Sequence, residues 1–469
     1  MSEHNNTNTR RTFLKTVGAK TIGATAVFAG IPNIISAHDR EMSVLELRRP
    51  PIISPNDKIR FATVGFGGRG MYDTDMALKQ AGTELAGTCD VYDGRTTRSR
   101  EIYGDKLFTT RHYEELLARP DIDAIIIAGT HHWNAKVSID ALKAGKAVYC
   151  EKPMVQKIEE GGPVIKAQKE SGKVFMVGSQ RVSSIVYEKA RQLIQSGAIG
   201  ELNYVEAWWD RNSAMGAWQY SIAPDASADN IDWNRFLGNA PKIPFEPIKL
   251  FRWRNYKDYG TGIAGDLFVH LFSGLHFILG CNGPTRIQST GGLRYWKDGR
   301  DVPDVLMGMY DYPATKTTPA FNLMLRSNFI DGSGGGTGFR FVGSEGVLSL
   351  DRDITVKKNK MGRPGYGIKS FPQTVQDEYI RQYNEKYPPT RAEMSDPPLL
   401  EFKAPEGYDD MNDHLAVFFD AVRNKKAVTE DAVFGFRATA PAILTQQCYY
   451  SNKASWWDPE NLRVAKPKV

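Results

Sequence analysis

A glycine-rich turn near residue 65 constrains the fold of this chain more than any other feature. The turn follows the apolar run "KIRFATV" and precedes "MYDTDMALKQ", which has the pattern of a helix. It has the spacing GxGxxG, and Asp90 ends the next apolar run 20 residues after the last glycine. A strand, a glycine turn, a helix and an acidic strand end in this order are typical of a dinucleotide-binding βαβ unit. The residues of the turn are Gly65, Phe66, Gly67, Gly68, Arg69 and Gly70.

Each residue type of this motif suits a dinucleotide. Gly65 permits the tight turn, Gly67 lets the backbone approach a pyrophosphate, and Gly70 allows the helix to pack closely on the strand. The helix N-terminus adds free N–H groups and a partial positive charge. Asp90 is expected to bind both hydroxyls of the adenosine ribose, which favours NAD, whereas Arg95 would partly offset its repulsion of a 2′-phosphate. We therefore expect NAD, with NADP less favoured; the alternative is a glycine turn that binds nothing.

The rest of the chain predicts two folded domains. Strand-like and helix-like patterns alternate over residues 58–180, which predicts an α/β Rossmann domain with a parallel sheet. Residues 181–469 contain several strand-like runs without regular intervening helices, so we expect an α+β domain with a large, mostly antiparallel open sheet. Helices are expected at about 412–423 and 430–447. Residues 358–405 are rich in Pro, Lys and Gly and are interpreted as an irregular insertion.

Composition excludes several classes of function. The chain has 469 residues, of which 41% are apolar and 24% charged, an ordinary balance for a globular protein. The net charge of +6 is spread along the chain without a basic stripe, which gives a nucleic-acid partner little support. The four cysteines lie far apart with no CxxC pair, so neither a disulfide framework nor a cysteine zinc site is expected. We expect no metal.

The N-terminus resembles a twin-arginine export signal. Arg10 and Arg11 are followed by Phe-Leu-Lys and then by a weakly apolar stretch that Lys20 interrupts. We expect residues 1–37 to be this signal and residues 38–57 a linker, so that the export machinery is a partner and the mature protein is periplasmic. This export route carries folded proteins, which would require a tightly held cofactor. The alternatives are a basic tail and a short membrane anchor.

Several further motifs carry a resemblance to a known family. A further strand-like run ends in Glu151-Lys152-Pro153, and Gln180-Arg181, "SGAIGEL", "DWNRFLG" and Gly265-Asp266-xxx-His270 follow downstream. Together with the glycine motif they make the chain resemble the Gfo/Idh/MocA family of sugar and inositol oxidoreductases, from Lys58 to about Gly346 and over the closing helices. This family usually has Pro and, four residues later, His in the loop after the fourth strand, where this chain has Thr130 and Asn134.

The resemblance implies that Lys152, Asp266 and His270 surround a reacting carbon. His270 would take the proton of a secondary hydroxyl, and Lys152 would assist and stabilise the negative oxygen, while hydride passes to the nicotinamide. The carboxyl ends of parallel strands face the ligand crevice, which places Lys152 suitably, and Asp266 and His270 share a helix face at i and i+4. The alternatives are a helix N-cap for Asp266 and a core position for His270. The further residues expected at the cofactor are Thr130, His131, His132, Trp133, Asn134, Glu151 and Gln180.

An aromatic-rich region between the two domains suggests a carbohydrate or polyol as the substrate. Sugar rings pack their C–H faces on aromatic planes, and their hydroxyls need polar partners. The residues expected to bind substrate are Arg211, Arg254, Tyr256 and Tyr259. The alternative is that these aromatic side chains pack in the core or at a subunit interface. The family resemblance also allows a homo-oligomer.

Three functions remain open from the sequence. The first is an NAD(P)-dependent oxidoreductase that acts on a secondary hydroxyl or ketone of a sugar, cyclitol or glycoside. The second is an NAD-dependent glycoside hydrolase that oxidises its sugar transiently and eliminates the aglycone; Lys152 argues against it, because the glycosidases of this type lack that lysine. The third is a binding protein without activity, which the intact Lys152 and His270 disfavour.

Overall fold

The computed structural model describes residues 57–359, 367–388 and 399–467. The expected export signal at 1–37 and nearly all of the expected linker lie outside the described residues, and so does part of the expected insertion. Within that insertion the described residues form helix α12 (Gln373–Lys386) and strand β14 (Leu400–Phe402), so the segment is not irregular throughout. The helix forms because its 14 residues contain neither glycine nor proline, a local feature that the composition of the whole segment conceals.

The N-terminal domain contains a six-stranded sheet in which every neighbouring pair of strands is parallel, in the order β3-β2-β1-β4-β5-β6. The order reverses between β1 and β4, and ligands bind at such a point, outside the carboxyl ends of the strands. The Rossmann fold expected from the sequence is confirmed. The strands are β1 (Ile59–Val64), β2 (Thr83–Cys89), β3 (Phe108–Thr110), β4 (Ala124–Ile127), β5 (Ala147–Glu151) and β6 (Phe175–Gly178). The helices between them are α3 (Gly68–Leu78), α4 (Asp93–Tyr103), α5 (Tyr113–Ala118), α6 (His131–Lys143) and α7 (Gly161–Ser171).

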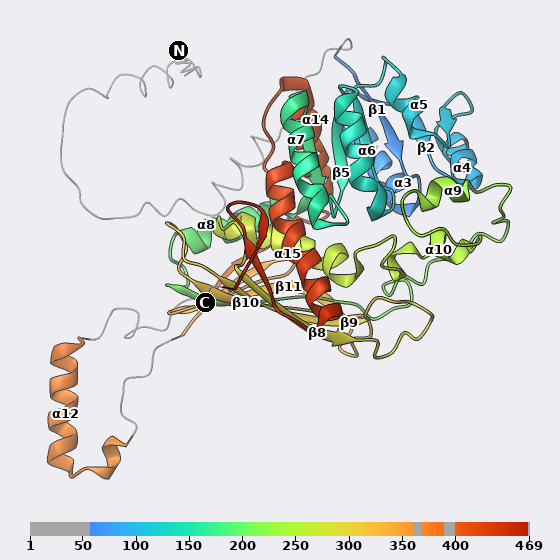
Figure 1. Ribbon diagram of the computed structural model, residues 1–469. Coiled ribbons are helices and arrows are strands. Elements are labelled where there is room, and N and C mark those ends of the chain that lie inside the picture. Colours follow the sequence, from blue (N-terminus) through green and yellow to red (C-terminus); the bar gives the residue numbers. More distant parts are fainter. Residues whose placement is uncertain (1–56, 360–366, 389–398, 468–469) are drawn as a thin grey trace, which may run out of the picture. The chain divides into compact units, whose positions relative to one another are not determined.

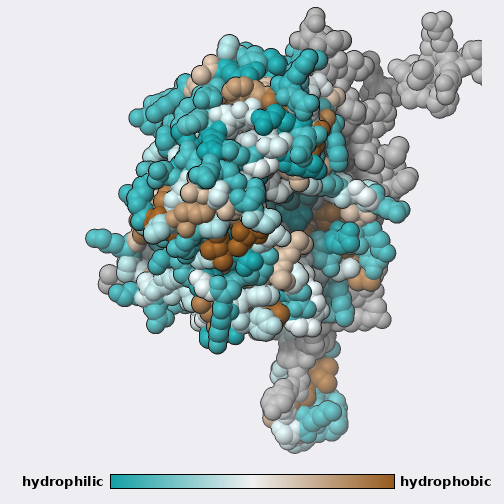
Figure 2. Space-filling model, turned by 90° about the vertical axis from the view of Figure 1, so that its right-hand side faces the viewer, coloured by the Kyte–Doolittle hydropathy of each residue, from teal (hydrophilic) through white to brown (hydrophobic). Residues whose placement is uncertain are grey.

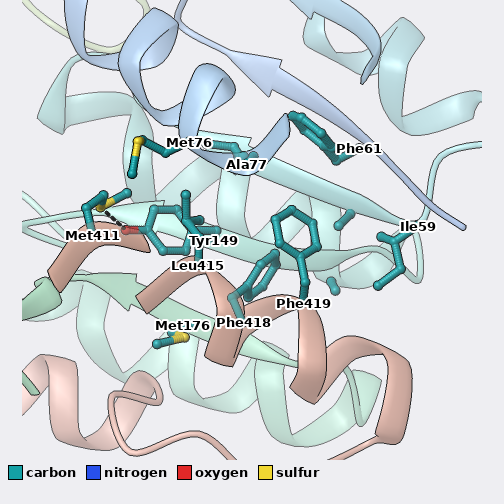
Figure 3. Packing of buried hydrophobic residues seen from close by; sticks show 13 residues of the cluster. Ile59, Phe61, Met76, Ala77, Tyr149, Met176, Met411, Leu415, Phe418 and Phe419 are labelled. Atoms are coloured by element: carbon teal, nitrogen blue, oxygen red, sulfur yellow. Dashed lines mark hydrogen bonds between the residues drawn. The ribbon is translucent and has the colours of Figure 1, made fainter. Parts of the chain in front are cut away.

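A helix from the end of the chain, α14 (Asp410–Asn424), completes the core of this domain. Its Phe419 lies 5.8 Å from Phe61 of β1, and its Phe418 lies 5.6 Å from Tyr149 of β5, measured between ring centroids. Figure 3 shows these rings meeting between α14 and the sheet. Burial of large apolar side chains is the main stabilising contribution to folding, so the N-terminal domain depends on residues near the other end of the sequence.

The C-terminal part contains a ten-stranded sheet, as expected. Strands β7 and β10 run parallel and the other neighbouring pairs run antiparallel. The strands in sheet order are β14, β13 (Ile354–Lys358), β12 (Gly346–Leu350), β11 (Gly336–Gly343), β7 (Leu202–Asp210), β10 (Phe321–Asn328), β9 (Val305–Tyr312), β8 (Arg286–Gly292), β15 (Ser455–Asp458) and β16 (Arg463–Ala465).

Helices pack between this sheet and the N-terminal domain (Figure 1). They are α8 (Ile185–Gln195), α11 (Val269–Leu279) and α15 (Ala432–Ser451). Helix α11 is buried along almost its whole length because it is nearly all apolar. Its Phe272 packs edge-on against Tyr310 of β9, and Thr445 of α15 accepts a hydrogen bond from Ser289 of β8 through its backbone carbonyl. The helix expected to bear Asp266 and His270 is present, but it begins with a π-helical turn, Ala264–Phe268, that contains Asp266.

Residues 220–260 run back along the N-terminal domain and include the short helices α9 (Trp233–Leu237) and α10 (Pro247–Phe251). Backbone hydrogen bonds join this segment to the residues that follow β2: Asp93 N–H donates to the carbonyl of Asn230, and Asp232 N–H donates to that of Val91. Aromatic side chains of the segment form a hydrophobic cluster of their own. We call residues 220–260 the cap.

The surface is polar over most of the face seen in Figure 2, and apolar side chains gather there only in small patches. Patches of this size are usual on the surface of a folded protein. In the part of the chain that the structure describes, no helix is long and apolar enough to span a membrane.

Candidate active site

At two positions of the glycine turn, the backbone conformation and the close packing permit only glycine. Gly65 has a φ of +88°, and a Cβ there would lie 2.6 Å from Cα of Gly129. A Cβ on Gly70 would lie 1.9 Å from the carbonyl oxygen of Gly65. The turn therefore brings the start of α3 against the ends of β1 and β4, as the sequence predicted.

The other two glycines leave the N-terminus of α3 open. A Cβ on Gly68 would have no atom of the described residues within 4 Å, and one on Gly67 would make only an ordinary contact, 3.5 Å, with the guanidinium of Arg95. Gly67 is the N-cap of α3 and contributes no capping side chain. Free N–H groups at a helix N-terminus bind phosphate groups, so this turn fits the pyrophosphate of a dinucleotide.

Asp90 follows β2 and is held by groups on both sides. Its carboxylate accepts hydrogen bonds from Phe66 N–H at 2.8 Å, from Tyr92 N–H at 3.0 Å and from Arg95 Nη1 at 3.2 Å. The Arg95 guanidinium also lies over the ring of Phe251 in the cap. Ribose hydroxyls would meet a carboxylate that is already fixed and partly neutralised by an arginine.

A cavity of about 500 Å³ extends from the glycine turn to the cap. Its volume is within the range of pockets for small molecules and cofactors. Seven residues that the sequence assigned to the cofactor line it, and Arg254 lines it from the cap. These seven are Gly65, Gly67, Gly68, Arg69, Asp90, Thr130 and Trp133.

The other residues assigned to the cofactor do not line this cavity. The ring of Phe66 is buried against Tyr103, and Gly70 packs under the turn. Asn134 is buried and donates hydrogen bonds to the carbonyl groups of Glu151 and Pro153, so it supports the turn after β5. His132 packs edge-on against Phe236 of the cap, with its Nε2 2.9 Å from the Phe236 carbonyl oxygen. The remaining four are His131, Glu151, Lys152 and Gln180.

Glu151 ties the end of β5 to α3. Arg69 Nη2 donates to its Oε1 at 2.7 Å, and Arg69 Nε lies 3.0 Å from Asp73, one turn further along α3. Burial raises the pKa of Asp73 well above its usual value, despite the opposing charge of Arg69. Glu151 is itself buried, so this ion pair holds the glycine helix and the Lys152 strand end in a fixed relation.

Lys152 and Asp266 are in direct contact. Lys152 Nζ donates to the backbone carbonyl of Asp266 at 2.9 Å and to its Oδ1 at 3.0 Å, and Arg254 Nε donates to the same Oδ1 at 3.2 Å. Although burial alone would raise the pKa of Asp266, the charges of Lys152 and Arg254 bring it well below its usual range. Burial lowers the pKa of Lys152, and the carboxylate of Asp266 partly opposes this shift. The site thus contains a fixed carboxylate between two cations.

His270 lies one turn further along the same helix and is buried. Its Nδ1 is 3.2 Å from Ser179 Oγ, and its ring packs against Trp209 at 5.0 Å between centroids. Burial lowers its pKa well below the usual value, and the charge of Lys152 lowers it further. His270 is therefore neutral at physiological pH and able to accept a proton.

Gln180 begins a 3₁₀-helix after β6, and its side-chain oxygen has an unfilled acceptor position. Oε1 is buried and accepts no hydrogen bond from the residues that the structure describes. Buried acceptors are nearly always satisfied, so this atom is suited to a donor from a ligand, such as a carboxamide.

The four residues expected to bind substrate fall into two pairs. Arg254 contacts Asp266, and the charge of Arg211 contributes to lowering the pKa of Asp266, so both arginines lie at the site. Tyr256 and Tyr259 instead belong to the hydrophobic cluster of the cap and are 5% and 2% exposed. The structure does not bring these two tyrosines to Asp266.

Two residues at the site gave no usable signal in the sequence. Ser179, which contacts His270, stands in no motif. His131 was grouped with the cofactor loop, but its side chain points to Asp266: the distance from Nε2 to Oδ1 is 3.6 Å. This contact joins the segment after β4 to the π-helical turn, and no local sequence pattern predicts it.

The four cysteines are buried and free. Among the residues that the structure describes, no group of three or more His, Cys, Asp or Glu side chains could hold a metal ion.

Comparison with known proteins agrees with this geometry. Residues 59–179 match the Gfo/Idh/MocA model, described as the oxidoreductase family with an NAD-binding Rossmann fold. These residues form an NAD-binding Rossmann domain. The NAD-binding domain contains the glycine turn, Asp90 and Lys152, whereas Asp266 and His270 lie beyond the match.

The curated relatives of this chain include glycosyl hydrolases and inositol dehydrogenases. The chain is 26% identical over 234 residues to glycosyl hydrolase family 109 protein 1 of Akkermansia muciniphila, which covers 43% of this chain and 48% of that protein. It is 30% identical over 142 residues to inositol 2-dehydrogenase of Salmonella typhimurium, covering 29% of this chain and 42% of that protein. The chain thus spans about half the length of the curated relatives it matches.

Solved structures share the fold over most of the chain. Aldose-aldose oxidoreductase from Caulobacter crescentus, complexed with glycerol, has a TM-score of 0.61 at 13% identity and covers 85% of this chain and 99% of that chain. Levoglucosan dehydrogenase in complex with NADH has a TM-score of 0.58 at 16% identity, covering 85% and 98%. At these identities the likeness concerns the fold alone.

Proposed function

We propose that the protein is an NAD(P)-dependent oxidoreductase that interconverts a secondary hydroxyl and a ketone on a sugar, cyclitol or glycoside. The observation that carries this proposal is the cluster of Lys152, Asp266 and His270, which is anchored to the carboxyl end of β5 in the NAD-binding domain. NAD is the expected cofactor, and NADP is the less favoured alternative, because the carboxyl group of Asp90 would repel a 2′-phosphate and Arg95 beside it would offset that repulsion only in part.

The residues of the cluster have complementary roles in this proposal. Bound NAD supplies the acceptor for the hydride that leaves the substrate carbon. If Nδ1–H of His270 donates to Ser179, Nε2 carries the lone pair that removes the hydroxyl proton. The ammonium of Lys152 stabilises the oxygen as negative charge develops, and Asp266 holds that ammonium in place. Arg211 and Arg254 are proposed to bind substrate hydroxyls.

The cap supports tight retention of the cofactor. Trp133 Nε1 donates to the carbonyl of Phe236, Asp93 N–H donates to the carbonyl of Asn230, and Asp232 N–H donates to that of Val91. Phe236, Leu250 and Phe251 form part of the cavity lining. A dinucleotide in this cavity would lie between the sheet and the cap, so its release would require these contacts to open.

The test has two steps. Denaturing the purified protein and analysing the released small molecules by mass spectrometry determines whether NAD or NADP is retained. Sugars and cyclitols are then screened for reduction of the bound cofactor by its absorbance, and Lys152→Met and His270→Ala variants are screened in parallel. A protein that retains no dinucleotide and binds none when it is added would contradict the proposal.

An NAD-dependent glycoside hydrolase is the second candidate, and some of the curated relatives support it. Glycosyl hydrolase family 109 protein 1 and an alpha-N-acetylgalactosaminidase of Shewanella oneidensis, 28% identical over 214 residues, are among them. The two functions differ in their product balance. A hydrolase would cleave an aryl glycoside with no net formation of NADH, whereas an oxidoreductase would leave the glycoside intact and change the redox state of the cofactor.

We also propose that residues 1–37 direct export to the periplasm by the twin-arginine route. Arg10, Arg11 and the Phe-Leu-Lys that follows support this proposal. Cell fractionation of the wild type and of a variant with both Arg10→Lys and Arg11→Lys tests it. Export is expected to cease in the variant, and equal amounts of both proteins in the periplasm would refute this route.

A homo-oligomer is proposed through the outer face of the ten-stranded sheet. Met307 and Met309 of β9 point away from the covering helices and are 42% and 59% exposed. Light scattering of the wild type and of Met309→Lys tests this assignment. A particle mass that is unchanged by the substitution, or a monomeric wild type, would contradict it.

A further inference from the structure

His131 is the first residue of α6, and its side chain is directed away from the dinucleotide cavity. It is 2% exposed and is not among the residues that line the cavity. Its ring contacts Trp253 edge-on, with 4.5 Å between the centroids. The neighbouring Thr130 and Trp133 do line the cavity, so the loop after β4 has two faces with different contacts.

The two nitrogen atoms of His131 meet two different partners. Nδ1 is 2.9 Å from Thr261 Oγ1, and Nε2 is 3.6 Å from Asp266 Oδ1. Thr261 occupies this place because residue 265 is a glycine: a Cβ on Gly265 would lie 2.1 Å from Thr261 Oγ1. The start of the π-helical turn is therefore shaped to admit the threonine hydroxyl.

The charges around His131 determine its hydrogen-bond pattern. Burial lowers its pKa well below the usual value, and the cations Arg254 and Lys152 lower it further, whereas the carboxylate of Asp266 opposes this. A neutral imidazole carries one N–H, and a carboxylate that faces Nε2 favours the hydrogen on that atom. Nδ1 then accepts from the hydroxyl of Thr261, which orients the ring.

We propose that His131, oriented by Thr261, is a positioning residue of the active site that fixes the carboxylate of Asp266 and, through it, the amine of Lys152. The proposal rests on the function proposed above. It assigns to His131 a role at the proton-transfer groups, whereas its place in the sequence suggested a contact with the cofactor.

Nitrogen atoms from three segments surround one oxygen of Asp266. Lys152, in the turn after β5, and Arg254, in the cap, donate hydrogen bonds to Oδ1, and Nε2 of His131, at the start of α6, lies 3.6 Å from the same oxygen. Loss of one donor would let the carboxylate rotate and would misplace Lys152 relative to the reacting oxygen, and small misplacements of this kind are costly in catalysis.

The principal test removes the hydroxyl of Thr261 with little change of shape. Thr261→Val is expected to lower kcat roughly 10- to 100-fold and to leave the Kd for NAD within about twofold of the wild type. Thr261→Ser keeps the hydroxyl and is the matched control, with kcat expected near that of the wild type. His131→Gln, which retains a donor at the position of Nε2, is expected to keep more activity than His131→Asn.

A second measurement requires no turnover. Trace labelling with acetic anhydride over a range of pH, followed by peptide mass spectrometry, gives the pKa of the Lys152 amine. Because the carboxylate of Asp266 raises that pKa, a less firmly held carboxylate is expected to lower it in Thr261→Val and not in Thr261→Ser. Lys166, which is exposed, serves as the internal control.

The outcomes distinguish the proposed function from the positioning role of His131. If the wild type turns over no sugar but the labelling pKa of Lys152 falls as expected, the proposed function fails and the positioning role stands. If the pKa of Lys152 and kcat are the same in Thr261→Val as in the wild type, the positioning role is overturned. Weaker NAD binding by the His131 variants, with kcat unchanged at saturating NAD, would also overturn it in favour of a cofactor contact.

Discussion

Lys152 and Asp266 are 114 residues apart in the chain, yet the amine of one donates to both the backbone carbonyl and the carboxylate of the other. The double contact fixes the lysine to the π-helical turn as well as to a side chain. The NAD-binding domain and the helix that bears His270 are thereby joined at the point where the proposed chemistry takes place.

The first prediction concerns Lys152. Replacing it with Met keeps most of the apolar stem and removes the charge, so turnover is expected to fall at least about 100-fold, because the developing negative oxygen loses its stabilising partner. Steady-state kinetics on the best substrate measure the loss, and retained NAD is quantified after denaturation. Lys166→Met at an exposed position is the matched control. Turnover by Lys152→Met within threefold of the wild type would exclude a role for this amine.

Two glycines of the turn are expected to respond in opposite ways. Gly67 has extended backbone angles that alanine adopts, and its Cβ would meet only Arg95, so Gly67→Ala is expected to fold with stability within about 0.5 kcal/mol of the wild type. The added methyl group would occupy the approach of the pyrophosphate, so NAD affinity should fall at least about tenfold.

Gly70→Ala is the counterpart. Its Cβ would clash with the carbonyl of Gly65, so unfolding free energy is expected to fall by about 1–3 kcal/mol. Urea unfolding and NAD titration of both variants distinguish the two effects. A Gly67→Ala protein that binds NAD normally would show that the cofactor does not approach this turn.

The cap makes a prediction about the rate of cofactor release. Phe251 lines the cavity and lies under the guanidinium of Arg95, so Phe251→Ala is expected to increase the rate of NADH dissociation about tenfold. Phe245 packs on Trp233 in the same cluster without lining the cavity, and Phe245→Ala is the control. Stopped-flow fluorescence of bound NADH measures both rates. Equal dissociation rates for the two variants would argue against a cap over the cofactor.

Stability is predicted to decline on mild acidification. His414 is buried, and burial lowers its pKa from 6.5 in the unfolded chain to about 4. The unfolded chain therefore binds a proton that the folded protein does not, and between pH 6.5 and 4 this residue removes about 1.4 kcal/mol of stability per pH unit. His131 and His270 act in the same direction, because their pKa values are also lowered.

His414→Gln tests the size of this contribution, since the amide can still donate to the carbonyl of Val177, as Nε2 of His414 does. Urea unfolding at pH 7 and pH 5 is expected to show a smaller loss of stability on acidification in the variant than in the wild type. An identical loss in both proteins would mean that His414 is protonated in the folded state.

The sequence predicted those parts of the site whose relative positions follow from general rules of the Rossmann fold. The glycine turn and Asp90 follow from one strand–helix–strand unit, and the position of Lys152 follows from the way parallel strands end at a common edge. The parallel and antiparallel sheets followed from the regular alternation of helix and strand and from its loss after residue 180.

The parts that the sequence did not predict depend on contacts between distant segments. Tertiary packing decides which aromatic side chains of the cap are buried in its hydrophobic cluster. The sequence therefore could not distinguish Tyr256 and Tyr259, which are buried there, from aromatic residues that contact a ligand. The side chain of His131 turns to Asp266 because of a threonine and a glycine in another segment, and no spacing within its own loop encodes this.

The position of helix α14 in the sequence determines when the N-terminal domain can complete its folding during synthesis. Ribosomes deliver the glycine turn early and residues 410–424 late, yet the early sheet needs Phe418 and Phe419 to cover one of its faces. A nascent or truncated chain that stops before residue 410 exposes that apolar face, where chaperones and proteases act. Folding of the nucleotide domain is thereby deferred until residues 410–424 have been translated.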